Sequence, residues 1–186
     1  GAVTAKKVLH VVEKALLVPP GMAQALSVRL QNDLNSFLMI SKRLETLKQK
    51  AETLVPHTQA AVLDTVPGIG KFLAAQYIAY VSDPSRFDNA DQIWAFAGFD
   101  PGRHDSGDYR YVGKISKRGP AGFRSTLYQI GLNTSQRHWS IRRCKERALQ
   151  RGKGAVGANI HAAHKANRIC YHLLLHQVPF DPAKAR

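Results

Sequence analysis

The sequence predicts a mainly α-helical protein, in which a helical, coiled-coil-like arm precedes a compact helical domain. Two observations support this prediction. Apolar residues recur at helical spacing along most of the chain, and glycines and prolines divide the remainder into segments of helix length. One stretch, residues 102–116, lacks the helical pattern, and its tyrosines favour a short irregular hairpin. We assign the arm to residues 1–55 and the basic domain to residues 56–186.

Two helices are expected in the arm. The first covers residues 4–18 and stops at the Pro19-Pro20-Gly21 run, and the second extends from about Met22 to Thr53. In the second helix, an a/d seam typical of coiled coils has spacings of 4, 3, 4 and 3, formed by Leu30, Leu34, Phe37, Ser41 and Leu44. The seam is short and Ser41 interrupts it, so it fits either a homo-oligomer or helix packing within one chain.

The basic domain is expected to contain short helices separated by glycine and proline. They cover residues of about 58–65, 71–81, 89–97, 120–135, 138–150 and 155–177.

The charge of the chain indicates a polyanionic partner. There are 27 Lys and Arg against 13 Asp and Glu, and the net charge is +14. Residues 1–64 contribute 8 − 5 = +3 and residues 65–186 contribute 19 − 8 = +11. DNA or RNA is therefore the expected ligand, with a solubilising basic surface as the alternative. The two cysteines form no CxxC pair, which argues against a disulfide framework or a thiolate zinc site and suits a reducing cytoplasm. No run approaches the roughly 18 apolar residues of a membrane span, so no membrane partner is expected.

A Val-Pro-Gly-Ile-Gly turn at residues 66–70 predicts a helix-hairpin-helix motif over about residues 62–81. Gly68 and Gly70 allow a tight turn and a close approach of the backbone to a ligand. The free N–H groups of the following helix then face a phosphate, and Lys71 adds charge. The alternative is a turn that only joins two helices.

A basic loop over about residues 98–119 contains the candidate nucleophile, Ser106. A serine hydroxyl needs a base or a metal to attack phosphorus, and His104 would share a strand face with Ser106. Cationic side chains that would neutralise a phosphodiester cluster nearby: Lys114, Lys117, Arg118 and Arg124. Ser116 is an equally placed rival, and composition alone does not separate the two serines.

These strings together resemble a known family. VPGIGKFLAAQYIAY, DPSRFDNADQIWAFAGFDP, and an SG pair followed by GKISKRGPAGFR look like the C-terminal transposase domain of bacterial DEDD transposases, which include Piv-type DNA invertases and bridge-RNA-guided insertion-sequence recombinases. The resemblance covers residues 62–181. It implies that Ser106 is the DNA nucleophile, that Lys117 and Arg118 support the same site, and that a guide RNA is a possible partner. It also implies a bacterial protein that is cytoplasmic and nucleoid-associated.

The family's N-terminal RuvC-like domain, with four metal-binding acidic residues, has no counterpart in this sequence. The resemblance implies that Mg²⁺ is held by that domain, with no metal bound by this chain, and that this chain alone is an inactive part of a transposase or recombinase. The role of His104 as a base is our own hypothesis. The alternative function is a non-enzymatic helix-hairpin-helix module that binds DNA junctions or RNA.

The last predicted helix has one apolar face and one basic face. The basic face includes Lys165 and Arg168 and predicts contact with a nucleic-acid backbone, with a solvated surface as the alternative. The pairs His172/His176 and His161/His164 also have the spacing of two zinc ligands, so a zinc site is a further alternative for this face.

Overall fold

The computed structural model describes residues 19–106 and 109–185, and of residues 102–114 it describes the backbone alone. The chain divides into two compact units, Gly1–Leu47 and Lys48–Arg186. The helix predicted over residues 4–18 lies outside the described residues. The domain boundary predicted after residue 55 stays a prediction.

Helix α2 extends without interruption over Pro20–Leu54. It begins two residues before the predicted start at Met22, because proline fits the first turn of a helix, where its missing N–H has no partner to lose. Ala23 N–H donates to the Pro19 carbonyl at 2.9 Å and closes that first turn. The apolar members of the predicted seam are all exposed, and α2 has no buried residue.

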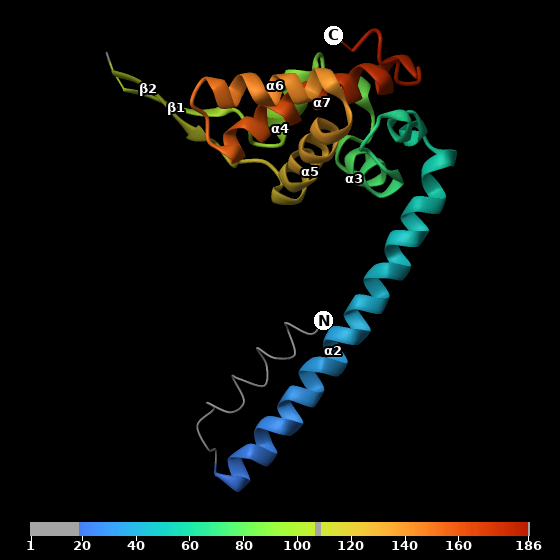
Figure 1. The fold of residues 1–186 in the computed structure, drawn as a ribbon, viewed down its shortest axis with the longest axis vertical. Helices are drawn as coiled ribbons and strands as arrows, with labels where there is room; N and C mark the ends of the chain where they lie inside the picture. Colours follow the sequence, from blue (N-terminus) through green and yellow to red (C-terminus); the bar gives the residue numbers. More distant parts are fainter. Residues whose placement is uncertain (1–18, 107–108, 186) are drawn as a thin grey trace. The chain divides into compact units, whose positions relative to one another are not determined.

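The second unit is built from short helices, as the sequence predicts, and the mainly α class is confirmed (Figure 1). In chain order its elements are η1 Val55–His57, η2 Gln59–Thr65, α3 Lys71–Val81, η3 Pro84–Arg86, α4 Ala90–Phe96, β1 Pro101–Ser106, β2 Tyr109–Ile115, α5 Ala121–Arg137, α6 Trp139–Gln150 and α7 Ala155–His176. Within the described residues no helix is both long and apolar enough to cross a bilayer.

The segment before the Pro-Gly-Ile-Gly turn is a 3-10 helix, η2, where the sequence predicts an ordinary helix over 58–65. Thr58 caps it through its hydroxyl, which accepts from Ala60 N–H at 3.2 Å. At the other end Val66 is extended and the next residue is Pro67, a position that disfavours helix in the residue before it. The segment is therefore only two turns long, which favours the tighter 3-10 form. The helix-hairpin-helix assignment stays a prediction.

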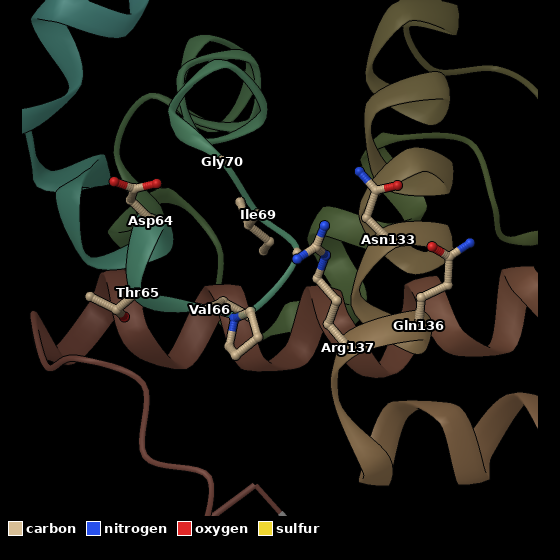
Figure 2. A pocket seen from close by; sticks show the side chains of 10 residues that line it. Asp64, Thr65, Val66, Ile69, Gly70, Asn133, Gln136 and Arg137 are labelled. Atoms are coloured by element: carbon tan, nitrogen blue, oxygen red, sulfur yellow. The ribbon is translucent and has the colours of Figure 1, made fainter.

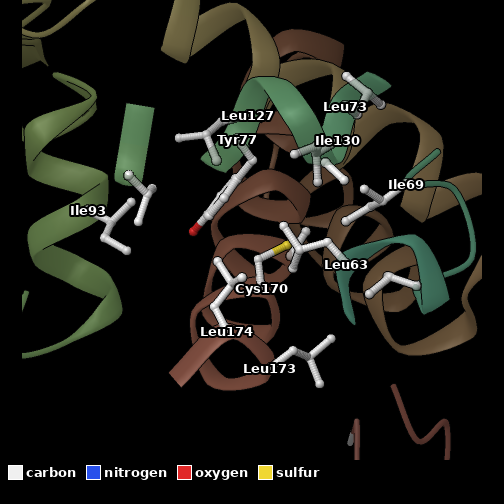
Figure 3. Packing of buried hydrophobic residues seen from close by; sticks show 14 of the residues in the cluster. Leu63, Ile69, Leu73, Tyr77, Ile93, Leu127, Ile130, Cys170, Leu173 and Leu174 are labelled. Carbon is white, nitrogen blue, oxygen red and sulfur yellow. The ribbon is translucent and has the colours of Figure 1, made fainter. Parts of the chain in front are cut away.

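The core of the second unit lies where α7 meets η2, α3, α4 and α5 (Figure 3). Its side chains come from all these elements and include Leu63, Ile69, Tyr77, Ile93, Leu127, Ile130, Cys170 and Leu174. Burial raises the pKa of the Cys170 thiol to about 12, so this cysteine is an apolar packing group.

One buried polar chain ties three helices together. Tyr77 of α3 donates its hydroxyl to Asn167 Oδ1 of α7 at 2.9 Å, and Asn167 Nδ2 donates to the Ala90 carbonyl at the start of α4 at 2.8 Å. Burial raises the pKa of Tyr77 well above its usual value, so the phenol stays protonated as a donor. These bonds fix α4, and with it the start of the hairpin that follows.

The hairpin consists of two antiparallel strands, β1 and β2, as the sequence predicts for residues 102–116. Pro101 pairs with Ile115 at its base and Ser106 with Tyr109 at the other end. The register shifts between Pro101 and Arg103, which agrees with the irregularity expected there. Figure 1 shows the hairpin extending outward from the helices of the second unit.

Candidate nucleic-acid interface and nucleophile loop

Ser106 is the last residue of β1 and pairs with Tyr109, at the end of the hairpin opposite its base. His104 precedes it in β1 opposite Tyr111, and Lys114 lies in β2. The side chains of His104, Ser106 and Lys114 fall outside the described part of the structure. Their predicted roles stay predictions.

The base of the hairpin is fixed by hydrogen bonds between residues that flank the two strands. Ser116 Oγ donates to Asp100 Oδ1 at 2.5 Å, and Ser116 N–H donates to the Asp100 carbonyl at 2.8 Å. Lys117 N–H donates to the Gly98 carbonyl at 2.9 Å. Ser116, the rival nucleophile, is thus bonded to a carboxylate that holds the two ends of the hairpin together.

The basic turn after the hairpin has an unusual backbone. Lys117 has φ of 55°, a left-handed conformation that costs a non-glycine residue about 1–2 kcal/mol. Gly119 follows, and a Cβ there would collide with the Phe96 carbonyl oxygen and lie 2.6 Å from the Ala97 carbonyl carbon. Only glycine allows this approach, so the turn is pressed against the end of α4. The side chains of Lys117 and Arg118 are exposed on it.

Arg124 of α5 also holds the basic turn in place, through hydrogen bonds to backbone carbonyl groups. Its Nη1 lies 2.6 Å from the Gly119 carbonyl oxygen, 3.1 Å from that of Ala97 and 3.3 Å from that of Lys117. These contacts give Arg124 a structural part that the sequence did not indicate. Its predicted contact with DNA is untested.

The Val-Pro-Gly-Ile-Gly turn packs against α5. Gly68 has φ of 103°, and a Cβ there would lie 2.8 Å from the carbonyl carbon and oxygen of Asn133. Glycine is therefore needed at this position for packing as well as for the turn. Gly70 is the N-cap of α3, with open space around it and no side-chain cap on the following N–H groups. Lys71, the first residue of α3, is exposed.

A pocket of about 460 Å³ lies between this turn and α5 (Figure 2). The turn forms one side, and α5 contributes Asn133, Gln136 and Arg137 on the other. In Figure 2 the Arg137 guanidinium lies beside the turn, while Asp64 of η2 lies across from it. Sequence reasoning missed these α5 residues, because only the fold brings them to the turn. The pocket therefore has a polar lining that includes one acidic residue, Asp64, and one basic residue, Arg137.

The two faces predicted for the last helix are present in α7. Ala163, Ala166, Cys170, Leu173 and Leu174 are buried and Ile169 is half-buried. On the basic face Arg168 is exposed and Lys165 is half-buried.

The histidines of that face differ in their surroundings. His164 Nε2 lies 2.8 Å from Asp91 Oδ1, which ties α7 to α4. The rings of His172 and His176 are 4.5 Å apart. Among the described residues no group of three or more His, Cys, Asp or Glu side chains is placed to hold a metal ion.

Comparisons with known proteins agree with the sequence motifs. Residues 60–146 match the family model described as "Transposase IS116/IS110/IS902 family". The chain is 29% identical over 125 residues to a pilin gene-inverting protein of Moraxella lacunata, an alignment that covers 66% of this chain and 39% of that protein. It is 28% identical over 173 residues to the transposase for insertion sequence element IS1111A of Coxiella burnetii, covering 91% of this chain and 46% of that protein.

A further relative is the insertion element IS116 uncharacterized 44.8 kDa protein of Streptomyces clavuligerus. The two are 29% identical over 105 residues, which is 55% of this chain and 26% of that protein. The chain thus spans less than half the length of each of these three relatives. The region that the family model matches, residues 60–146, includes the Val-Pro-Gly-Ile-Gly turn, the hairpin and the basic turn.

Proposed function

Because this chain carries a C-terminal transposase domain of the IS116/IS110/IS902 family, we propose that it cleaves and rejoins DNA strands through Ser106 as part of a transposase or site-specific recombinase. The base of the hairpin is the observation that supports this choice of serine. Ser116 is bonded to Asp100 there, so it has a structural part. Of the two candidate serines, Ser106 is the one that lies at the end of the hairpin opposite its base.

In the proposed reaction the Ser106 hydroxyl oxygen attacks a DNA phosphorus atom. A phosphoserine bond forms, the bond from phosphorus to the leaving DNA oxygen breaks, and that oxygen leaves as a free DNA hydroxyl. We assign the serine proton to His104, two residues earlier in β1, and the leaving oxygen takes up a proton from the resulting imidazolium or from water. Lys114, Lys117 and Arg118 would offset the negative charge that the phosphate gains in the transition state.

Mg²⁺ belongs to the proposed complete site, but the described residues do not fit a magnesium site. They bring together no group of three potential ligand side chains. On the basis of the family resemblance we assign the ion to an RuvC-like domain of the complete protein and propose that the present chain alone is inactive. The chain covers 39% and 46% of the two longest-matched relatives, which leaves room for such a domain in proteins of that length.

The turn at residues 66–70 would position DNA without reading its sequence. Backbone N–H groups at the start of α3, with Gly68, Gly70 and Lys71, are proposed to grip a phosphate. Lys165 and Arg168 of α7 are proposed to contact the backbone elsewhere. A guide RNA and self-association through α2 are further proposals, supported by the resemblance of the motifs and by the exposed seam of α2.

The test compares two serine variants in the complete protein. Ser106→Ala should abolish strand exchange while leaving DNA binding nearly unchanged, because one neutral hydroxyl adds little to a binding energy made by many phosphate charges. Ser116→Ala removes a hydrogen bond at the hairpin base and should lower stability by about 1 kcal/mol while keeping measurable exchange. Full exchange by Ser106→Ala would exclude the proposed nucleophile and favour a module that only binds nucleic acid.

A further inference from the structure

A second pocket, of about 430 Å³, lies between α6 and α7 and shares no residue with the hairpin or with the turn at residues 66–70. Its size is within the range of roughly 300–1,000 Å³ that ligand pockets occupy. No aspartate or glutamate lines it. Five basic side chains line it: Arg143, Arg147, Arg151, His161 and Lys165.

The three arginines form a ridge that reaches the C-terminal end of α6. Arg143 and Arg147 lie in α6 and Arg151 is its C-cap, and because they are four residues apart their side chains follow one face of the helix. Among the described residues none of the three has an ion-pair or side-chain hydrogen-bond partner, in contrast to Arg142, which donates to the Ser135 carbonyl at 3.2 Å. Three neighbouring positive charges without a carboxylate attract an anion, and a guanidinium can hold a phosphate through two parallel hydrogen bonds.

One of these arginines, Arg151, acts on a neighbouring histidine. His161 of α7 has a lowered pKa, through desolvation first and then through repulsion from Lys153, Arg151 and His164.

Trp139 adds an aromatic surface to the same pocket. It is the first residue of α6 and is 52% exposed. The chain's other tryptophan, Trp94, is stacked on Phe99 with ring centroids 4.1 Å apart and so has a packing role. An exposed indole beside arginines is the combination that proteins use to stack the bases of unpaired strands.

We propose that this pocket binds an unpaired nucleic-acid strand, with a backbone phosphate held by Arg143 and Arg147 and a base stacked on Trp139. An unpaired strand fits because the bases of a duplex already stack on one another and do not expose a face to a side chain. The inference goes beyond the proposed function: it assigns a binding subsite and requires no strand cleavage.

The basic surface continues past the pocket. Lys165 also lines a neighbouring pocket of about 1040 Å³, formed by α7 and the segment after it, together with Arg168, His172 and Lys184. One acidic residue, Asp181, lines this neighbouring pocket too and lies 4.0 Å from Lys184. A strand of several nucleotides can therefore follow α7 from one pocket into the next.

The first experiment measures binding of a fluorescent oligothymidylate of about 12 nucleotides, within the site sizes of single-strand binding proteins. The protein is the 186-residue chain, without Mg²⁺. Trp139→Ala should weaken binding about fivefold or more, because the stacking of a base on an aromatic ring is worth at least that factor. Arg147→Ala should weaken it and reduce the salt slope by about 0.7, the value for one phosphate contact on a single strand.

The matched control is Lys145→Ala, which removes the same charge from α6 at a residue that does not line the pocket. It should change affinity by less than about twofold, since it alters only the general field. Equal losses in Lys145→Ala and Arg147→Ala would mean that only net charge matters and would overturn the proposal. An oligonucleotide with abasic sites should lose the Trp139 dependence, and binding of equal strength by that oligonucleotide would also overturn it.

A readout that needs no variant comes from the cysteines. Cys144 lines the pocket and is half-buried, with Sγ 3.5 Å from the His161 carbonyl oxygen, while Cys170 is fully buried. Alkylation of the native chain by iodoacetamide therefore reports on Cys144, and saturating oligothymidylate should slow it. An unchanged alkylation rate would place the strand elsewhere and contradict the proposal.

Matched DNA, RNA and duplex oligonucleotides identify the source of the strand. Protection of Cys144 by single-stranded DNA or by single-stranded RNA supports the proposal, and the stronger protector names the natural ligand. Stronger protection by duplex than by either single strand would overturn it. Because no strand is cut in these assays, their result is independent of whether Ser106 is the nucleophile.

Discussion

Arg124→Met tests the role of Arg124 in holding the basic turn against α4. Methionine keeps a flexible stem of similar length but removes the charged donor. Nη1 contacts the carbonyls of Gly119, Ala97 and Lys117 at 2.6, 3.1 and 3.3 Å. Since one guanidinium nitrogen has two hydrogens, these three contacts amount to one or two full charge-assisted bonds. At about 1.5–3 kcal/mol for such a bond, the variant should lose about 2–3 kcal/mol of unfolding free energy.

The assay is urea unfolding followed by circular dichroism, with thermal unfolding beside it. A loss of that size corresponds to a fall of roughly 5–10 °C in Tm for a chain of this length. Arg118→Ala is the control, because that side chain is exposed and has no hydrogen-bond partner among the described residues, while the backbone N–H of Arg118 lies 3.5 Å from Ser116 Oγ. It should change stability by less than about 0.5 kcal/mol. Equal stability of Arg124→Met and the wild type would refute the structural role of Arg124.

Three further outcomes follow from the structure. Nucleic-acid affinity should fall steeply as salt rises, because of the +11 on residues 65–186, and binding that ignores salt would contradict an electrostatic interface. Leu34→Asp should convert a dimer into a monomer in sedimentation, because Leu34 is exposed on α2, and a wild-type chain that is already monomeric at tens of micromolar (about 10⁻⁵ M) would contradict the dimer seam. Burial, and then Lys165, lower the pKa of His138. Below about pH 6.5 the unfolded chain therefore binds a proton at His138 that the folded chain binds less readily, so the free energy of unfolding should fall as pH drops through that value. The fall should be smaller in His138→Gln. Identical profiles of unfolding free energy against pH for the wild type and His138→Gln would count against this.

The helices of the second unit were predictable because their signals are local. Glycine or proline follows most of the segments closely, although α5 ends at Arg137 without either, and the predicted helix over 71–81 has the same bounds as α3. Near residue 60 the prediction was wrong in type, since the segment is a 3-10 helix. Only seven residues lie between the threonine cap and Val66-Pro67. A segment this short does not show enough hydrophobic repeats to distinguish an α-helix from a 3-10 helix.

The packing around the candidate site was not predictable, because it joins residues far apart in sequence. The close approach of Gly68 to Asn133 depends on how α5 lies against the turn, and no local pattern encodes it. The same holds for Arg137, which reaches that turn only in the fold. The arginine ridge of α6 is visible as a spacing of four, but its meaning depends on α7 forming the other wall of the pocket.

The choice between the two serines shows how sequence and structure complement each other. Composition left Ser106 and Ser116 equivalent. The structure adds a hydrogen bond from Ser116 to Asp100, sixteen residues away in the chain, which explains why a serine stands there. The attacking role of Ser106 remains a prediction from the resemblance.

Trapping of the covalent intermediate tests the central claim most directly. The complete protein is incubated with Mg²⁺ and a suicide DNA substrate whose leaving strand is lost after cleavage, and any protein–DNA adduct is digested and mapped by mass spectrometry. The proposed mechanism predicts an adduct on Ser106 that is absent from Ser106→Ala and present in Ser116→Ala. An adduct on Ser116, or on any residue other than Ser106, would contradict it.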